Sequence, residues 1–277
     1  MFNAMIRAEI WLQETIGKQI SINELADHLG YSDSQVRRQF RHYFDTSPSA
    51  YRDQRRLEHA AVLLALTPKN IAQIALVCGY YNHSSFSRAF HKHFSVSPRH
   101  FRQSIRRTLQ RQRPPSGFTT RIIQKPQRQF ILRRYYKAPE QLKGLGTAEL
   151  HTESLPSLPK TWTQTTPSIA LPDLLTEKIG ARVAPSAALP RTDVGFCLAS
   201  QEALALKPSL PMTYRRMTLA PQHYAITCFD DFSALSHALT HALYQLLCHP
   251  TPFYISGAAP YVLWRKTSLE LRLPLSK

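Results

Sequence analysis

The stretch IAQIALVCGYYNHSSFSRAFHKHFSVSPRHFR at residues 71–102 repeats an earlier stretch, INELADHLGYSDSQVRRQFRHYFDTSPSAYR at residues 22–52. The offset is 49 residues as far as Tyr80 and 50 residues after it. Self-similarity at a fixed period indicates one supersecondary unit used twice. The shared positions are Ala26, Gly30, Tyr31, Phe40, Phe44, Pro48 and Tyr51 in the first copy and Ala75, Gly79, Tyr80, Phe90, Phe94, Pro98 and Phe101 in the second.

Each copy predicts two helices separated by a glycine turn. Ser21 and Glu24 have the spacing of a capping box, which begins a helix, and Gly30 suits the left-handed backbone that ends one. In the second copy Asn70 takes the capping position and Gly79 the turn. The sequence therefore predicts two helix-turn-helix units, at about residues 21–44 and 70–94, and this motif is typical of DNA-reading proteins.

The segment between the two copies predicts a long connecting helix. Ser47 and Pro48 form a typical helix start, and Thr67-Pro68 ends the pattern after Leu66. About 18 residues at 1.5 Å each make a rod of roughly 27 Å. Such a rod can hold the two reading helices about one DNA turn apart on one side of the duplex. A lead helix at residues 5–16 and a closing helix from Pro98 complete an all-α domain.

The second helix of each copy carries polar side chains that are expected to face solvent, opposite an apolar row. Serine and arginine side chains in this position can hydrogen-bond base edges and phosphates. The alternative is a helical bundle whose arginines are merely solvated, but two copies with matched caps, glycines and aromatic residues favour DNA binding. The candidate DNA-binding residues are Ser34, Gln35, Arg37, Arg38 and Arg41 in the first copy and His83, Ser84, Ser85, Arg88 and Lys92 in the second.

Composition narrows the class of protein. The formal net charge is +17, which favours a polyanionic partner such as double-stranded DNA. Splitting at Phe118 gives +9 before it and +8 after it, so the charge does not locate the binding site. Four scattered cysteines, no apolar run of about 20 residues and no signal-peptide pattern predict a cytoplasmic protein without a membrane segment.

The pattern changes after the repeat, which predicts a second domain. Residues 1–112 are expected to form the first domain, 113–120 a proline- and glycine-containing linker, and 121–277 the second domain. The arginine-rich run 99–113 either contacts phosphates or is the solvated face of the closing helix. Strands are predicted at 130–136, 195–199, 224–229, 261–264 and 268–273, with a helix at 232–247, which together indicate an α+β fold. In the last strand, Leu269, Leu271 and Leu273 predict a buried face, and Glu270 and Arg272 a polar one.

The motifs of the second copy, Gly79-Tyr80, Phe86-Ser87-Arg88-Ala89-Phe90 and Ser97-Pro98, make residues 5–107 similar to the DNA-binding domain of the AraC/XylS family of bacterial transcription regulators. The resemblance implies that the second helix of each unit enters the major groove and that RNA polymerase is a partner, as for an activator, although the sequence leaves activation and repression both open. It carries reading positions over to Ser34, Arg37 and Arg38 and to His83, Ser84 and Arg88. Several relatives have a large aromatic residue at the position of Ser34, so a base preference does not transfer.

Residues 217–277 resemble the gyrase-inhibitor-like (GyrI-like) effector-binding domain, although Gln222 and Asp231 stand where that family often has glycine. Residues 138–191, with seven prolines, depart further from it. The resemblance implies an aromatic-lined cleft for a small apolar or cationic effector, with Glu270 facing the ligand. Cation–π faces would come from Tyr224, Tyr261 and Trp264. The alternative is that Glu270 pairs with Arg272 or solvent and that the aromatic residues are core.

These observations predict a DNA-binding transcription regulator that is not an enzyme and binds DNA as a monomer, because one chain supplies both reading units. The competing hypothesis is a GyrI-like protein that sequesters or hydrolyses a small molecule and is merely tethered to DNA. No cofactor motif is found. His237 and His241 have a metal-compatible spacing but no obvious third ligand, so no metal site is predicted.

Overall fold

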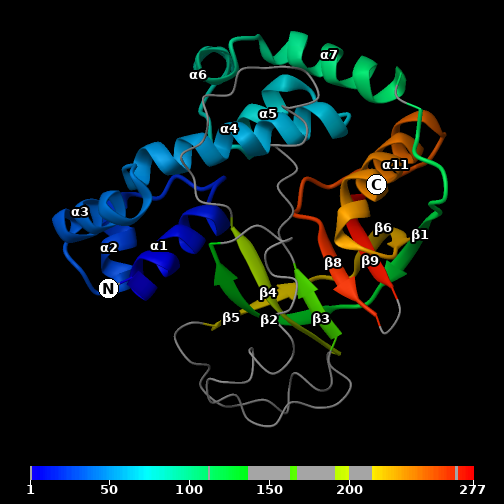
Figure 1. The fold of residues 1–277 in the computed structure, drawn as a ribbon. Helices are drawn as coiled ribbons and strands as arrows, with labels where there is room; N and C mark the ends of the chain where they lie inside the picture. The colour runs from blue at the N-terminus through cyan, green and yellow to red at the C-terminus, as the bar shows by residue number, and fades with distance from the viewer. Residues whose placement is uncertain (1, 112, 137–162, 167–190, 200–213, 266–267) are drawn as a thin grey trace. The chain divides into compact units, whose positions relative to one another are not determined.

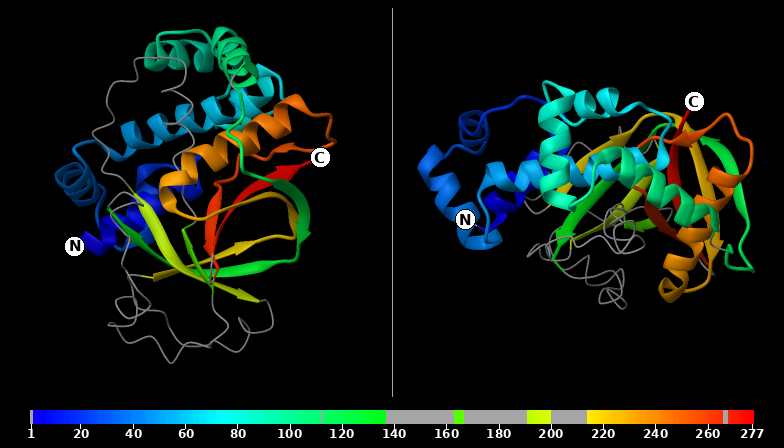
Figure 2. Two further views of the ribbon diagram at one scale, coloured as in Figure 1. Left: turned by 45° about the vertical axis from the view of Figure 1, so that its right-hand side comes forward. Right: turned by 90° about the horizontal axis from the view of Figure 1, so that it is seen from above.

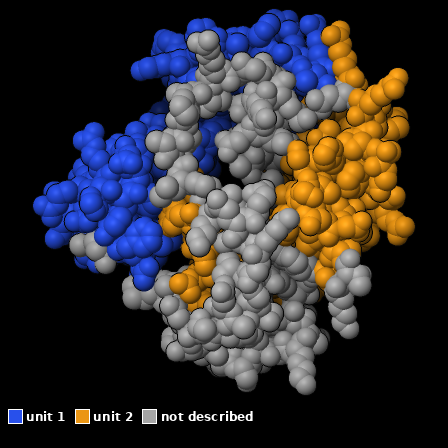
Figure 3. Space-filling model, in the orientation of Figure 1, with its two compact units in different colours: residues 1–108, 170–189 blue, residues 109–169, 190–277 orange. Residues whose placement is uncertain are grey.

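The computed structural model describes residues 2–111, 113–136, 163–166, 191–199, 214–265 and 268–277. It divides into two compact units (Figure 3), which meet in sequence between residues 108 and 109. Each unit is described by itself below. The proline-rich stretch 138–191, apart from residues 163–166 and 191, lies outside the described residues.

The described part of the first unit is all helical, as predicted, and follows the order expected from the repeat. Helices α2 and α3 lie near one end of the long helix α4, and α5 and α6 lie near its other end (Figure 1). With 19 residues, α4 is about 28 Å long. The bounds are α1 Phe2–Glu14, α2 Ile22–Leu29, α3 Asp33–Phe44, α4 Pro48–Leu66, α5 Ile71–Val77, α6 His83–Phe94 and α7 Pro98–Arg111.

The predicted helix starts and turns are confirmed in both copies. The Ser21 side chain accepts the Glu24 N–H at 3.1 Å, and Asn70 does the same for Gln73 at 2.8 Å. Both are capping boxes, which satisfy backbone donors that the first helical turn leaves without an internal partner. Gly30 and Gly79 have φ angles of 73° and 78°, a left-handed conformation that disfavours other residues.

Each copy is held by a row of buried aromatic rings on the inner face of its reading helix. Phe40 packs edge-on against Tyr51 with ring centroids 5.5 Å apart, and Phe90 packs edge-on against Phe101 at 5.4 Å. All four side chains are buried. Because the same contact joins α3 to α4 and α6 to α7, both reading helices are fixed to the next helix in the same way.

The second unit is a mainly antiparallel β structure with one long helix, consistent with the predicted α+β class. Its nine described strands join in the order β1-β6-β9-β8-β3-β4-β2-β5, and β7 pairs with β9. Helix α11 packs against β1, β6 and β9 (Figure 2). The bounds are β1 Thr120–Lys125, β2 Arg128–Tyr135, β3 Thr163–Thr166, β4 Thr192–Ala199, β5 Tyr214–Leu219, β6 Gln222–Phe229, η2 Phe232–Ala234, α11 Leu235–Cys248, β7 Tyr254–Ile255, β8 Tyr261–Trp264 and β9 Leu269–Ser276.

The order of the strands in this sheet is symmetric. Each strand counted from one end of the order has a counterpart at the same place counted from the other end. Strands β1, β6, β9 and β8 take the places of β5, β2, β4 and β3. The registers agree, because Arg121 pairs with Ile226 as Arg215 pairs with Leu132. Arg121 and its counterpart Arg215 are 94 residues apart in sequence, and so are Leu132 and its counterpart Ile226. The second unit is therefore built on a two-fold plan, although its two halves share no motif of the kind found in the first unit.

The predicted polar face of the last strand is wrong in one respect. Glu270 is half-buried, as a polar edge position allows, but Arg272 is only 3% exposed. Its guanidinium lies 5.9 Å from the centre of the Tyr261 ring and donates to Glu270 at 2.8 Å. A charged residue is buried here because an ion pair and an aromatic face replace its hydration, which alternation along a strand does not reveal.

Candidate nucleic-acid interface

The outer face of α3 is polar and accessible. Val36, Phe40 and Phe44 point into the core, and every candidate on the opposite face of α3 is exposed: Ser34, Gln35, Arg37, Arg38 and Arg41. Arg37 is oriented by its neighbour one turn earlier, because its Nε lies 3.0 Å from Oδ2 and 3.1 Å from Oδ1 of Asp33. This contact uses the Nε atom of the guanidinium, and half of the Arg37 side chain is exposed.

The outer face of α6 has the same layout with different chemistry. His83, Ser84, Arg88 and Lys92 are exposed. Ser85 is half-buried, and its hydroxyl donates to the Asn82 carbonyl at 3.0 Å. Arg38 and Arg88 stand 50 residues apart and occupy the same place in the two copies. The two faces thus share a serine, at Ser34 and Ser84, and a central arginine, at Arg38 and Arg88, but differ in most of their other hydrogen-bonding groups.

In each copy a pair of arginines donates hydrogen bonds to backbone carbonyls, and the sequence did not predict these contacts. In the first copy Arg52 donates to the Ile20 carbonyl, and Arg56 donates to the carbonyls of Ile16 and Lys18 at 2.9 Å each. These carbonyls belong to the segment that joins α1 to α2.

The second copy repeats this arrangement. Arg102 donates to the carbonyls of Leu64 and Lys69, and Arg106 donates to those of Ala65 and Thr67. Burial lowers the pKa of Arg102 and Arg106, although both remain strong bases. The 50-residue offset from Arg52 and Arg56 was the signal that could have identified these residues.

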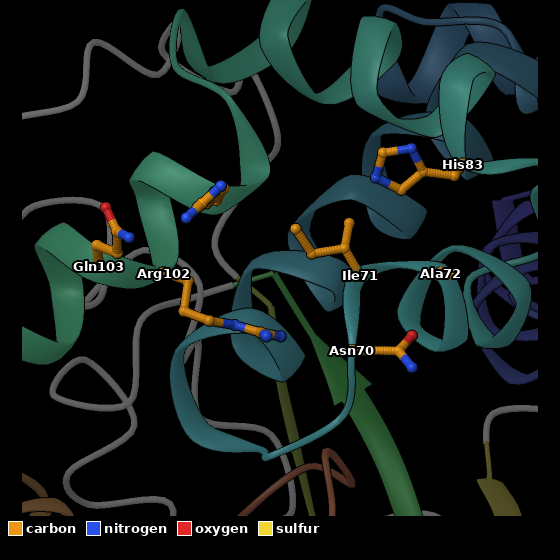
Figure 4. Close-up of a pocket in the computed structure, with 7 residues that line it drawn as sticks. Asn70, Ile71, Ala72, His83, Arg102 and Gln103 are labelled. Carbon is orange, nitrogen blue, oxygen red and sulfur yellow. The ribbon is translucent and has the colours of Figure 1, made fainter.

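A shallow hollow of about 530 Å³ lies beside the second reading helix (Figure 4). It is bordered by the starts of α5 and α6 and by one face of α7. Ile71 and Ala72 form its apolar floor, and His83 and Gln103 stand on opposite sides. Arg99, which is exposed, completes the rim. The hollow therefore combines a cation and polar groups next to a helix that is expected to approach DNA.

In the second unit, the Glu270 carboxylate is held by two arginines. Arg265 Nε donates to one of its oxygens at 2.9 Å, and Arg272 Nη2 donates to the other at 2.8 Å. Burial acts to raise the pKa of Glu270, but the hydrogen bonds and charges of the two arginines outweigh burial, so the pKa is lower than usual. The carboxylate is ionised and its charge is balanced within the unit.

The aromatic candidates of this unit differ in how they are placed. Tyr224 and Tyr261 are 2% and 1% exposed, and their rings pack edge-on at 5.7 Å as part of the core. The backbone of Trp264 ends β8 opposite Leu269, and its side chain lies outside the described part of the structure. The geometry of the two tyrosines favours the packing interpretation over a free ligand face.

A cavity of about 620 Å³ lies between β1, the end of β6 and the start of α11. Phe118, Ile123 and Phe229 line it with apolar surface, and Arg121, Lys125 and Glu270 add charge. Burial lowers the pKa of Lys125, and the positive charge of Arg272 lowers it further. The cavity is of a size that can accept a small molecule.

Other groups considered for chemistry have structural partners or lie apart. His241 Nδ1 is 3.2 Å from the Pro115 carbonyl oxygen, and His237 is exposed on α11. Across the described residues, no three metal-ligating side chains gather at one point. No described helix has the length and apolar content needed to cross a bilayer.

Comparison with known proteins matches residues 25–104 to the helix-turn-helix domain family. The transcriptional regulator Rob of Salmonella typhimurium is 33% identical over 122 residues, covering 44% of this chain and 42% of Rob. The right origin-binding protein of Escherichia coli is 34% identical over 106 residues, covering 38% of this chain and 37% of that protein. The N-terminal unit contains an AraC-type helix-turn-helix domain.

Some solved structures are also similar to part of this chain. A transcriptional regulator with an AraC-type DNA-binding domain from Chromobacterium violaceum is 34% identical, and the match covers 36% of this chain and 90% of that one with a TM-score of 0.35. This chain spans less than half the length of the curated relatives that it matches.

Proposed function

We propose that this protein is a sequence-specific DNA-binding transcription regulator that reads two successive major-groove segments. The observation that carries the proposal is the pair of exposed basic faces on α3 and α6, set at equivalent positions near the two ends of α4. Each face lies on a helix whose opposite side is anchored by buried aromatic rings. Rigid presentation of polar side chains on a helix is what major-groove reading requires.

Arg38 and Arg88 are the proposed central base contacts, one in each segment. An arginine can donate two parallel hydrogen bonds to the O6 and N7 acceptors of guanine. Arg37, held by Asp33, and His83 flank these contacts and provide different donors in the two copies. Because both helices belong to one chain, a monomer can occupy both segments, and RNA polymerase is the proposed partner at the promoter.

The hollow beside α6 is a proposed contact with the DNA backbone. Arg99 lies at its rim with His83, so a phosphate there would meet a cation and a hydrogen-bond donor. Such contacts position the protein without reading sequence, and each neutralised phosphate adds to the salt dependence of binding.

The decisive experiment selects bound duplexes from a random library with the full chain and then compares variants on the enriched sequence. Arg38→Ala and Arg88→Ala are each expected to weaken binding by about 1–3 kcal/mol and to relax preference in one segment only. The matched control is Arg216→Ala, which removes the same charge from an exposed position of the second unit. Equal losses in all three variants would show a non-specific charge effect and reject the proposal.

We propose in addition that the second unit is a GyrI-like effector-binding domain and that the cavity at Phe118 and Phe229 is its site. The pairing of Glu270 with two arginines favours an apolar effector over a cationic one. Nile red, a neutral apolar dye, is a suitable probe. Cys228 lines the cavity and is exposed, so Cys228→Trp should fill the space and abolish the dye's fluorescence gain, whereas undiminished gain would reject this site.

A further inference from the structure

The two copies of the reading unit contact each other directly, through two segments that lie outside α4. The loop between α1 and α2, residues 15–21, belongs to the first copy, and the turn between α5 and α6, residues 78–82, belongs to the second. The Gln19 side-chain amide donates to the Gly79 carbonyl. A Cβ placed on Gly17 would stand 2.6 Å from the Val77 carbonyl oxygen. We call this contact the junction and define it by Gly17, Gln19, Val77 and Gly79.

Arg56 lies beneath the junction. It comes from α4, is 7% exposed, and donates to the carbonyls of Ile16 and Lys18 in the loop of the first copy. A Cβ on Gly79 would stand 2.8 Å from its Nη2 atom. The turn of the second copy therefore rests against a guanidinium that is already tied to the first copy.

Comparing the two copies shows which contacts occur in both copies and which occur only at the junction. Arg106 makes the same two carbonyl contacts in the second copy, so the arginine clamp is a property of each copy. Gly30 has nearly the same φ as Gly79, but a Cβ added to it would meet nothing within 4 Å. Two features therefore favour glycine at position 79: its left-handed backbone and the close approach of Arg56. The second feature arises from the contact between the copies.

We propose that the junction fixes the rotational phase between α3 and α6 and thereby sets the spacing between the two DNA segments that the protein accepts. The inference rests on the proposed DNA-reading function. Helix α4 alone sets the separation of the copies, whereas the junction adds a second point of attachment and prevents one copy from pivoting about the rod. One base pair inserted between the segments shifts them by about 3.4 Å and rotates them by about 34°, which a pivoting pair of readers would tolerate.

Two substitutions loosen the junction by different routes. Gly17→Ala places a methyl group against the Val77 carbonyl and pushes the loop from the turn. Gln19→Ala removes the hydrogen bond and adds no bulk. The matched control is Gly30→Ala, which strains an equivalent turn where the added Cβ meets no neighbour. Should Gly17→Ala fail to fold, Gln19→Ala carries the test.

The first measurement needs no DNA. Spin labels at the exposed positions His42 and Lys92, on α3 and α6, report the distance distribution between the two copies in the full chain. Wild type and Gly30→Ala should give one narrow distribution, and Gly17→Ala and Gln19→Ala broader or shifted ones. Unchanged distributions in both junction variants would overturn the inference.

The second measurement uses the duplex enriched by selection together with versions carrying one base pair more or fewer between the two segments. Wild type should lose about tenfold or more in affinity on these versions, and the junction variants about threefold or less. An identical penalty in wild type and Gln19→Ala overturns this inference and leaves DNA reading intact. Failure to enrich any duplex overturns the proposed function and the inference with it.

Discussion

Both units of this protein follow a duplicated plan, but the duplication is visible in residue identity in only one of them. In the helical unit, matched glycines, caps and aromatic rings recur at offsets of 49 and 50 residues. In the sheet unit, the strand order and registers repeat, while Arg134 in one half has Cys228 as its counterpart in the other.

The helical repeat is visible in the sequence and the sheet repeat is not, because the two architectures constrain residue identity to different degrees. A short helix pair needs a particular residue at a few points: a side-chain acceptor at the cap, a glycine where φ is positive, and a ring of the right size between helices. A strand needs mainly alternation, which many sequences satisfy. A repeat of helix pairs is therefore easier to recognise from residue identity than a repeat of strands.

One chemical feature is nevertheless retained in both halves of the sheet. Asp193 and Glu270 occupy equivalent registers, opposite Arg134 and Cys228 respectively. Asp193 accepts from Arg134 at 2.9 Å and from Arg215 at 2.8 Å, as Glu270 accepts from its own two arginines. A carboxylate clamped by two guanidiniums is thus common to the halves, and it is more deeply buried in the first.

The largest expected effect tests this equivalence at Asp193. Asp193→Asn leaves the buried Arg134 without its counter-charge, so we expect a loss of about 3–5 kcal/mol in the free energy of unfolding of the second unit. Chemical denaturation followed by far-UV circular dichroism measures it. A loss below about 1 kcal/mol would mean that the ion pair is as weak as a surface pair.

The same residue gives a pH dependence of known sign. Burial acts to raise the pKa of Asp193, but the charges and hydrogen bonds of Arg134 and Arg215 outweigh burial, so the pKa in the folded protein is lower than that of a free aspartate. The stabilisation is therefore complete above about pH 4 and is lost as the pH falls through the folded pKa. In Asp193→Asn, the free energy of unfolding should depend less steeply on pH below about 4. An unchanged pH dependence would show that Asp193 is not its source.

A smaller effect is expected at the equivalent position of the other half. Glu270 is nearer to solvent, and one of its partners, Arg265, is 42% exposed, so screening weakens the pair. We expect Glu270→Gln to cost about 1 kcal/mol in the same unfolding experiment. A loss equal to that of Asp193→Asn would show that the two halves are energetically as well as topologically equivalent.

The smallest effect tests the equivalence of the helical copies. Ser21→Ala and Asn70→Ala each remove the side-chain acceptor of a capping box, and each should cost about 0.5–1 kcal/mol by thermal unfolding. Ser87→Ala, at a half-buried position on α6 away from the cap, is the control and should change stability by less than about 0.5 kcal/mol. Strongly unequal losses at the two caps would mean that the copies differ in stability despite their common pattern.

The sequence predicted the helical unit almost residue by residue, because caps and glycines mark helix ends locally. Helix α4 was predicted from Pro48 to Leu66 and has those bounds. In the sheet unit, β1 and β5 were missed because Thr120–Lys125 and Tyr214–Leu219 mix charged and apolar residues without clean alternation. Both are edge strands, whose exposure relaxes the pattern.

In the candidate site, too, some features could be predicted from the sequence and others could not. Exposure of Ser34, Arg38 and Arg88 followed from helical periodicity. The arginine clamps at Arg56 and Arg106 did not, because a guanidinium that binds distant carbonyls looks in sequence like any solvated arginine. Likewise, the pairing of Glu270 was one of two alternatives until the positions of Arg265 and Arg272 were known.

By itself, the order of residues determined two helix pairs, the rod between them and the faces that carry their basic side chains, because hydrogen-bonded caps, positive-φ glycines and helical periodicity act over a few neighbours. Only the tertiary structure decided which charges are neutralised, how the strands pair, and that a loop near Gly17 touches a turn near Gly79. The contact between Gln19 and Gly79 joins groups 60 residues apart, and the ion pair of Arg134 with Asp193 joins groups 59 apart. Such groups become neighbours only on folding, and no local rule specifies them.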